Sequence, residues 1–124
     1  MTAARSRALI VDDESSICDS LQMKIRQLSA ATVDVAGSAA DGVKHLMRAK
    51  YALIFVDLDL IRGSFGDCVR SIRPQPITIG MTAAADFEID VRDASLVHAV
   101  IRKPADLERI ANVAVGILQT PQRR

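Results

Sequence analysis

The sequence predicts an α/β domain in which helices cover both faces of a parallel sheet. Three observations support this fold class: short apolar runs of strand length, segments of helical character between them, and their regular alternation along the chain. Strands that alternate with helices pair in parallel, because each helix carries the chain back across one face of the sheet. The chain has 124 residues, so we expect a single domain over residues 1–124 with a core of about 6–119.

The first strand and helix have clear signals. Residues 8–11 (ALIV) are wholly apolar and too short for a helix, which favours a strand buried on both faces. Ser15 or Ser16 has the chemistry of an N-cap for the helix that follows. That helix is predicted over about 15–29 by apolar residues that recur every three or four positions: Ile17, Leu21, Ile25 and Leu28.

The middle of the chain continues the alternation. Residues 32–36 (TVDVA) alternate and include β-branched side chains, which predicts an outer strand. An apolar stripe predicts a second helix from 39 to about 48, and ALIFV at 52–56 is the strongest candidate for a central strand. A glycine-containing loop over 58–66 comes next. A short helix over about 65–72 follows, and two prolines end it.

The last third predicts two more strands. Residues 77–80 (ITIG) and 96–101 (LVHAVI) have strand character, and a stripe of apolar residues from Leu107 to Leu118 predicts the final helix. The acidic segment 83–94 predicts a weakly amphipathic helix between the two strands. Its acidic residues favour a solvated face, with a partner surface as the alternative.

Composition narrows the classes of protein. Hydrophobic residues make up 49% and aromatic residues 3%, so the chain can bury a core that is mainly aliphatic. A net charge of +1 does not favour binding to nucleic acid or to an anionic membrane. Cys18 and Cys68 lack metal-ligand or CxxC spacing and fit reduced, packed thiols. The N-terminus has neither a signal peptide nor a membrane span, so we expect a cytoplasmic protein.

Chemically competent residues follow four of the predicted strands. Asp12 and Asp13 come after the first strand, Asp57 after the third, Thr82 after the fourth and Lys103 after the fifth. The carboxyl ends of parallel strands meet at one edge of a sheet, where ligands bind in open α/β folds. We therefore expect these five side chains to share one pocket.

The three carboxylates of this pocket predict a divalent cation site. Asp12, Asp13 and Asp57 would repel one another strongly, and one of them would stay protonated without a compensating charge. Mg²⁺ (or Mn²⁺) prefers oxygen ligands and commonly uses one or two carboxylates together with waters and a phosphate. A metal bound by Asp12, Asp13 and Asp57 is what this arrangement needs.

The same pocket has the parts of a phosphoryl-transfer site. An aspartate beside Mg²⁺ can act as a nucleophile toward phosphorus, which makes Asp57 a candidate phosphoacceptor. Lys103 supplies a compact cation for a phosphoryl oxygen, and the Thr82 hydroxyl can donate a hydrogen bond to another. Positioning and electrostatics of this kind are the main requirements of phosphoryl transfer.

With these residues in order, the chain resembles the CheY-like receiver domains of response regulators in two-component signal transduction. The family pattern is an acidic pair after the first strand, a phosphoacceptor aspartate after the third, Thr or Ser after the fourth and Lys-Pro after the fifth. This chain has Asp12-Asp13, Asp57, Thr82 and Lys103-Pro104 at those places. The resemblance covers essentially the whole chain and implies a flavodoxin-like (βα)5 fold, doubly wound, with strand order 2-1-3-4-5.

The resemblance also implies a function and a set of partners. Asp57 would accept a phosphoryl group from the phosphohistidine of a histidine kinase or histidine phosphotransfer protein in a phosphorelay. Asp13 would ligate Mg²⁺ directly, Asp12 would assist through water, and the backbone carbonyl of Asp59 would be a further ligand. The Lys103-Pro104 peptide bond is cis in the family. Such a domain is not an enzyme beyond its own phosphorylation and dephosphorylation. The resemblance also implies that phosphorylation switches the binding of a downstream protein. Formation of a homodimer is a further option.

Two positions depart from the family pattern. Ile61 stands where many members have a proline, and Val100 stands three positions before the lysine, where Tyr or Phe is usual. In typical members this aromatic ring swings inward when the Thr or Ser moves toward the phosphate. We therefore expect the phosphorylation chemistry to be retained and the signalling surface to be atypical.

Other functions and local roles stay open at this point. A pseudo-receiver would keep the fold as a constitutive docking module, and Asp57-Leu58-Asp59 also reads as the DxD motif of haloacid-dehalogenase-like phosphatases. Asp12 and Asp13 could instead cap the first helix, and Thr82 could cap the fourth. His45 and His98 fit surface or packed positions. Met1 and the PQRR end favour a stand-alone regulator over a piece of a hybrid kinase or longer regulator.

Overall fold

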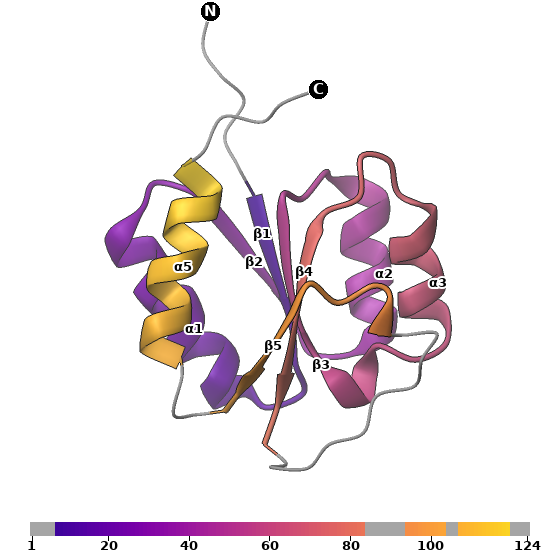
Figure 1. Ribbon diagram of the computed structural model, residues 1–124, viewed down its shortest axis with the longest axis horizontal. Coiled ribbons are helices and arrows are strands. Elements are labelled where there is room, and N and C mark those ends of the chain that lie inside the picture. Colours follow the sequence, from indigo (N-terminus) through magenta and orange to yellow (C-terminus); the bar gives the residue numbers. More distant parts are fainter. Residues whose placement is uncertain (1–6, 84–93, 104–106, 120–124) are drawn as a thin grey trace, which may run out of the picture.

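The computed structural model describes residues 7–83, 94–103 and 107–119 (Figure 1). Strands and helices alternate along the chain as the sequence predicts. They are β1 (Arg7–Val11), α1 (Ser15–Leu28), β2 (Thr32–Ala36), α2 (Ala39–Arg48), β3 (Leu53–Asp57), the 3-10 turn η1 (Leu58–Leu60), α3 (Ser64–Ser71), β4 (Ile77–Thr82), β5 (Ala99–Arg102) and α5 (Leu107–Gln119). Most of the helix expected over 83–94 lies outside the described residues.

The five strands form one parallel sheet in the order β2-β1-β3-β4-β5. This order confirms the predicted doubly wound, flavodoxin-like fold. The chain runs outward from β1 to β2, then crosses back to β3 and continues in the opposite direction to β5. The order of the strands therefore reverses between β1 and β3, and a ligand crevice is expected at the carboxyl ends of these two strands.

Helices cover the sheet in two layers, with α1 and α5 on one face and α2 and α3 on the other (Figure 1). Side chains alternate along β1, so Ile10 joins the core beneath α1 and α5 while Leu9 joins the core on the opposite face. The core is mainly aliphatic, as the composition predicts. Each layer also buries one phenylalanine, Phe55 in the first and Phe65 in the second.

The start of α1 differs from the prediction. Neither Ser15 nor Ser16 is the N-cap; Glu14 occupies that position, and Ser15 is the first helical residue. The Glu14 N–H donates to the Asp12 carboxylate at 2.9 Å, so the chain already turns before the serines. The Asp12 carboxylate binds the N–H of the N-cap residue itself, and among the described residues no side chain caps the first turn of α1.

Two other boundaries shift. The strand expected over 96–101 runs from Ala99 to Arg102. The Thr78 N–H donates to His98 Nδ1 at 3.0 Å, so a side chain takes a donor that would otherwise pair with the start of this strand. The stretch expected as a loop over 58–66 contains η1 and the first turn of α3. Gly63, with φ of 71°, allows the turn between them.

Within residues 7–83, 94–103 and 107–119, no helix is both long enough and apolar enough to cross a membrane.

Candidate functional site

The predicted site residues lie together at the carboxyl edge of the sheet. Asp12 directly follows β1, Asp57 is the last residue of β3, Thr82 is the last residue of β4, and Lys103 directly follows β5. The Lys103 N–H donates to the Thr82 carbonyl at 2.9 Å, which ties the lysine to the end of the neighbouring strand. The topology thus gathers four residues that are widely separated along the chain.

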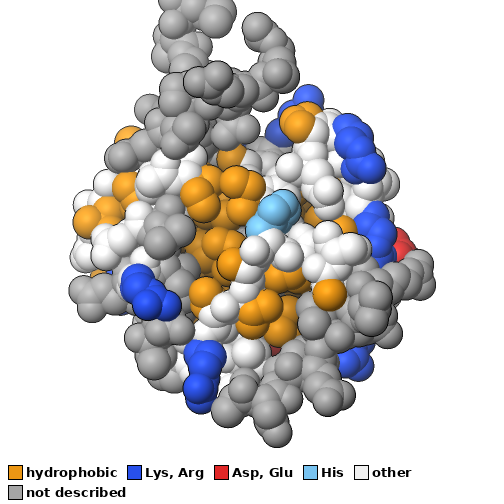
Figure 2. Space-filling view, viewed as in Figure 1, with side chains coloured by type: hydrophobic (Ala, Val, Ile, Leu, Met, Phe, Trp, Pro, Cys, Tyr) orange, Lys and Arg blue, Asp and Glu red, His pale blue; other side chains and the backbone are white. Residues whose placement is uncertain are grey.

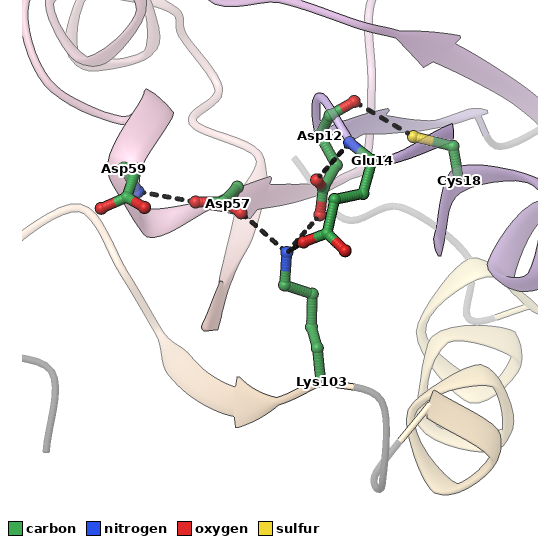
Figure 3. Close-up of polar contacts among 6 residues, drawn as sticks. All are labelled: Asp12, Glu14, Cys18, Asp57, Asp59 and Lys103. Atoms are coloured by element: carbon green, nitrogen blue, oxygen red, sulfur yellow. Dashed lines mark hydrogen bonds and ion pairs between the residues drawn. The ribbon is translucent and has the colours of Figure 1, made fainter. Parts of the chain in front are cut away.

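Lys103 occupies the centre of this pocket (Figure 3). Its Nζ donates to Asp57 Oδ2 at 2.7 Å, to Glu14 Oε1 at 2.8 Å and to Asp12 Oδ2 at 2.9 Å. Burial alone would lower the pKa of Lys103, but the hydrogen bonds to these three carboxylates outweigh that effect and raise the pKa above its usual value. The lysine is therefore a permanent cation that compensates part of the acidic charge.

The three predicted metal ligands come close enough to share one ion. Carboxylate oxygens of Asp12, Asp13 and Asp57 all lie within 4.8 Å of one another. Burial raises the pKa of Asp12, and its hydrogen bonds with Lys103 and with the Glu14 N–H offset that rise in part. Three hard oxygen donors with an excess of negative charge fit Mg²⁺ or Mn²⁺ by chemistry and by spacing.

Backbone donors orient the two buried carboxylates. The Asp59 N–H donates to Asp57 Oδ1 at 2.8 Å across η1, so Lys103 and the backbone hold opposite oxygens of Asp57. Asp12 is held in the same way, because Glu14 N–H binds its Oδ1 and Lys103 binds its Oδ2. Both aspartates therefore have fixed orientations before any ligand arrives.

Other predicted residues are placed less completely. Thr82 is buried at the end of β4, and the contact of its hydroxyl with a phosphoryl oxygen stays a prediction. The same holds for the Asp59 carbonyl as a metal ligand. Pro104, and with it the expected cis peptide bond, lies outside the described residues. Val100 is 50% exposed on β5, opposite Gly80 of β4.

The face that carries β5 at the front of Figure 1 is largely apolar near its middle. Figure 2 shows apolar side chains gathered there, with Lys and Arg side chains nearer the rim. Val100 is one of the exposed large hydrophobic residues, so β5 presents an aliphatic side chain where the resemblance to receiver domains leads us to expect an aromatic ring. The departure predicted at Val100 thus lies at an exposed position of β5.

Sequence reasoning missed two residues of the pocket. Glu14 contacts Lys103, although the two residues are 89 positions apart in the chain. Its position directly after Asp12-Asp13 was the available signal, because a third acid at the same strand end must lie near the same cation. Cys18 was interpreted as a packed thiol, and it is buried; its Sγ also donates to the Asp12 carbonyl at 3.3 Å.

Comparisons with known proteins agree with this geometry. No family model and no curated protein matches the sequence. A solved CheY-like response regulator receiver domain from Methanospirillum hungatei JF-1 matches with a TM-score of 0.76 at 24% identity, over 93% of this chain and 94% of that one. The chain has the receiver fold.

Two further receiver structures match to a similar extent. The REC domain of AraT, a response regulator from Geobacillus stearothermophilus, gives a TM-score of 0.76 at 21% identity, over 94% of this chain and 95% of that one. A CheY-like receiver domain from Methylobacillus flagellatus gives 0.73 at 18% identity, over 92% and 99%. The resemblance to receiver domains is thus confirmed for the fold, and the acidic pocket lies at the strand ends of that fold.

Proposed function

We propose that this chain is a phosphorylatable receiver of a phosphorelay and that Asp57 is its phosphoacceptor. The observation that supports this most is the position of Lys103, whose ammonium binds Asp57 and Asp12 within one pocket. Asp13 adds a third carboxylate within 4.8 Å of these two acids. A lone lysine with a single acid would be explained as a structural ion pair, whereas this excess of carboxylates favours a further cation.

The proposed reaction is a phosphoryl exchange between nitrogen and oxygen. An oxygen of Asp57 attacks the phosphorus of a phosphohistidine, the P–N bond breaks as the new P–O bond forms, and the electron pair stays on the imidazole nitrogen. Water later attacks the phosphorus, the P–O bond to Asp57 breaks, and inorganic phosphate leaves. In both steps Lys103 and Thr82 donate hydrogen bonds to oxygens of the phosphoryl group that is transferred.

The acidic pocket needs a metal for this reaction. Asp12, Asp13 and Asp57 would hold Mg²⁺ or Mn²⁺, with the Asp59 carbonyl as a further ligand. When bound, the metal supplies positive charge that lets an anionic phosphoryl group approach an acidic pocket. Lys103 remains the protein's own cation beside Asp57 Oδ2, and the Asp59 N–H keeps the acceptor carboxylate oriented through Oδ1.

The phosphoryl donor is a histidine kinase or a histidine phosphotransfer protein in this proposal. The phosphoryl group on Asp57 carries about −1.5 to −2 of charge at neutral pH and replaces the single negative charge of the carboxylate. We expect this change to shift the population of two conformations and so to change the binding of a downstream protein. Turnover is confined to the domain's own phosphoryl group. A cytoplasmic location and the option of a homodimer belong to the same proposal.

Incubation with acetyl phosphate and Mg²⁺ tests the proposal. Intact-mass measurement should show the addition of one phosphoryl group to the native chain, and Asp57→Asn should show none. The addition should disappear when a chelator removes the metal. A native chain that gains no phosphoryl group, or an Asp57→Asn chain that gains as much as the native one, would contradict the proposal.

A constitutive docking module is the alternative function. The exposed Val100 favours it, because the usual aromatic switch residue is missing from β5. Titration with Mg²⁺ separates the two, since a docking module would bind the metal poorly. The matched structures named above are receiver domains, so they give no support to a haloacid-dehalogenase-like phosphatase. Hydrolysis of a generic phosphate ester by the chain would support that function instead.

A further inference from the structure

The ammonium of Lys103 has a third partner that the proposed reaction does not use. Besides Asp12 and Asp57, it donates to Glu14 Oε1 at 2.8 Å (Figure 3). A lysine ammonium has three N–H donors, so these three carboxylates occupy all of them. A phosphoryl oxygen that is to receive a hydrogen bond from Lys103 must therefore displace one of the three partners.

The three partners differ in how easily they can be displaced. The side chain of Asp12 is 0% exposed and that of Asp57 is 11% exposed, and the second oxygen of each is fixed by a backbone N–H. The side chain of Glu14 is 53% exposed. Its carboxylate can return to water at small cost, whereas a buried carboxylate that loses its cation cannot.

We propose that Glu14 is a positioning residue for Lys103, a displaceable carboxylate that holds the ammonium in the pocket and gives it up to the phosphoryl group. This inference rests on the proposed function of Asp57 as phosphoacceptor. It also gives the ammonium a partner when a divalent cation competes with it for the oxygens of Asp12 and Asp57. Glu14 should therefore affect the two ligands of the pocket in opposite directions.

The expected effects follow from two competitions: Lys103 competes with Mg²⁺ for carboxylate oxygens, and Glu14 competes with the phosphoryl group for the Lys103 ammonium. Without the Glu14 carboxylate, Lys103 depends more strongly on Asp12 and Asp57, so Mg²⁺ should bind more weakly. A phosphoryl group no longer has to displace Glu14, so its analogue beryllofluoride should bind more tightly once Mg²⁺ is saturating. A half-exposed ion pair predicts shifts of about two- to fivefold in each dissociation constant.

Titration of the full chain followed by backbone amide NMR measures both constants. The chain has no tryptophan and one tyrosine, so intrinsic fluorescence gives little signal, whereas amide shifts report binding directly. Glu14→Gln should raise the dissociation constant for Mg²⁺ and lower that for beryllofluoride at saturating Mg²⁺. Equal constants in Glu14→Gln and the native chain would overturn the inference.

Two control variants separate contact from charge. Asp19→Asn removes a carboxylate that is exposed on the same helix but is not one of the three on Lys103, so it should change both constants far less. Glu14→Asp keeps the charge but shortens the side chain, so it should behave like Glu14→Gln if the contact matters. The inference would be overturned if Glu14→Asp had the dissociation constants of the native chain, or if Asp19→Asn had those of Glu14→Gln. Either result would show that the negative charge acts at a distance and that the contact with Lys103 has no effect.

The native chain shows which proposal fails. A native chain that binds neither Mg²⁺ nor beryllofluoride overturns the proposed function and this inference with it. A native chain that binds both, beside a Glu14→Gln chain with unchanged constants, overturns the role of Glu14 alone. Thermal unfolding of each variant checks folding, and Glu14→Asp provides the test if Glu14→Gln unfolds.

Discussion

The two ends of the sheet carry polar clusters of opposite design. At the carboxyl end, Lys103 lies among Asp12, Glu14 and Asp57, with Asp13 close by. Nearer the start of β1 and β3, the Tyr51 hydroxyl donates to Asp34 Oδ2 at 2.5 Å, and Arg7 approaches the same oxygen at 3.6 Å. The first cluster has more acids than its cation can neutralise, whereas the second pairs one acid with one cation and one hydroxyl.

The cluster at the carboxyl end is therefore a candidate ligand site, whereas the cluster of Tyr51, Asp34 and Arg7, called the brace below, links neighbouring elements of the fold. In a balanced cluster every polar group has a partner within the protein, so no ligand is needed to compensate its charge. The contact between Tyr51 and Asp34 is therefore explained by its contribution to stability. An unbalanced cluster costs free energy until another charge arrives, and such costs are typical of functional sites. The following experiments test this contrast, beginning with the largest expected effect.

Substitution of the acceptor gives the largest difference between the two ends. Asp57→Asn should abolish phosphoryl incorporation from acetyl phosphate, because the amide lacks the nucleophilic oxygen. Tyr51→Phe should incorporate the group as the native chain does. Intact mass after incubation measures both, and a loss of incorporation in Tyr51→Phe would show that the far cluster also serves the reaction.

The thiol beneath the acidic pocket gives a pH-dependent effect. Burial first, and then the charge of Asp12, raises the pKa of Cys18 from 9.0 to about 11. Because the folded value lies above the unfolded one, this stabilisation is complete below pH 9 and is lost between pH 9 and about 11. The loss is roughly 3 kcal/mol for a shift of this size.

Denaturant unfolding of the native chain and Cys18→Ala at several pH values measures this contribution. The stability difference between the two chains should shrink across this pH range, since Cys18→Ala has no thiol to ionise. Other groups titrate in both chains and cancel in the difference. A difference that stays constant from pH 8 to pH 11 would show that the Cys18 pKa is not raised.

Removal of one acid should have opposite signs at the two ends. Asp13→Asn relieves repulsion in the acidic pocket and should stabilise the metal-free chain by about 1 kcal/mol. It should also reduce the stabilisation that Mg²⁺ gives the native chain. Asp34→Asn removes the charge that faces Arg7 and should destabilise the chain by about 1 kcal/mol without changing the Mg²⁺ effect.

Thermal unfolding with and without Mg²⁺ checks both variants. If both variants lose stability in the absence of metal, the acidic pocket is a balanced cluster like the one at the other end. The native chain is the reference in each condition, because metal binding stabilises only a fold that contains the site.

The smallest effect is expected from the hydroxyl of the brace. Burial and then the hydrogen bond to Asp34 raise the pKa of Tyr51, so the phenol keeps its proton to a higher pH than a free tyrosine does. Tyr51→Phe removes this hydrogen bond and should cost about 1 kcal/mol in the free energy of unfolding. A cost near zero would mean that Asp34 finds a replacement donor in water or in Arg7.

Much of the fold could be predicted because its signals are local. Wholly apolar runs such as 52–56 belong to strands that are buried on both faces, and polar residues after them mark the strand ends. The parallel topology then brings Asp12, Asp57 and Lys103 together without further information. This is why the meeting of these three residues could be predicted although they are far apart in sequence.

The remainder depends on contacts that no local pattern encodes. Glu14 was not expected to contact Lys103, because that contact depends on how the first turn of α1 faces the end of β5. The start of β5 was placed too early because the His98 side chain binds the N–H of Thr78, a donor that would otherwise serve the strand ladder. That Tyr51 and Asp34 form a brace could not be predicted either, because the two lie on different elements.

The two bonds that fix Asp57 have a consequence for its chemistry. Oδ1 faces the Asp59 N–H and Oδ2 faces the ammonium of Lys103, so the two oxygens are no longer interchangeable. A free carboxylate rotates and can offer either oxygen, whereas the Asp57 carboxylate is held in one orientation toward an incoming phosphoryl donor. The entropy of aligning the nucleophile is therefore lost once, when the chain folds, and not again at each encounter.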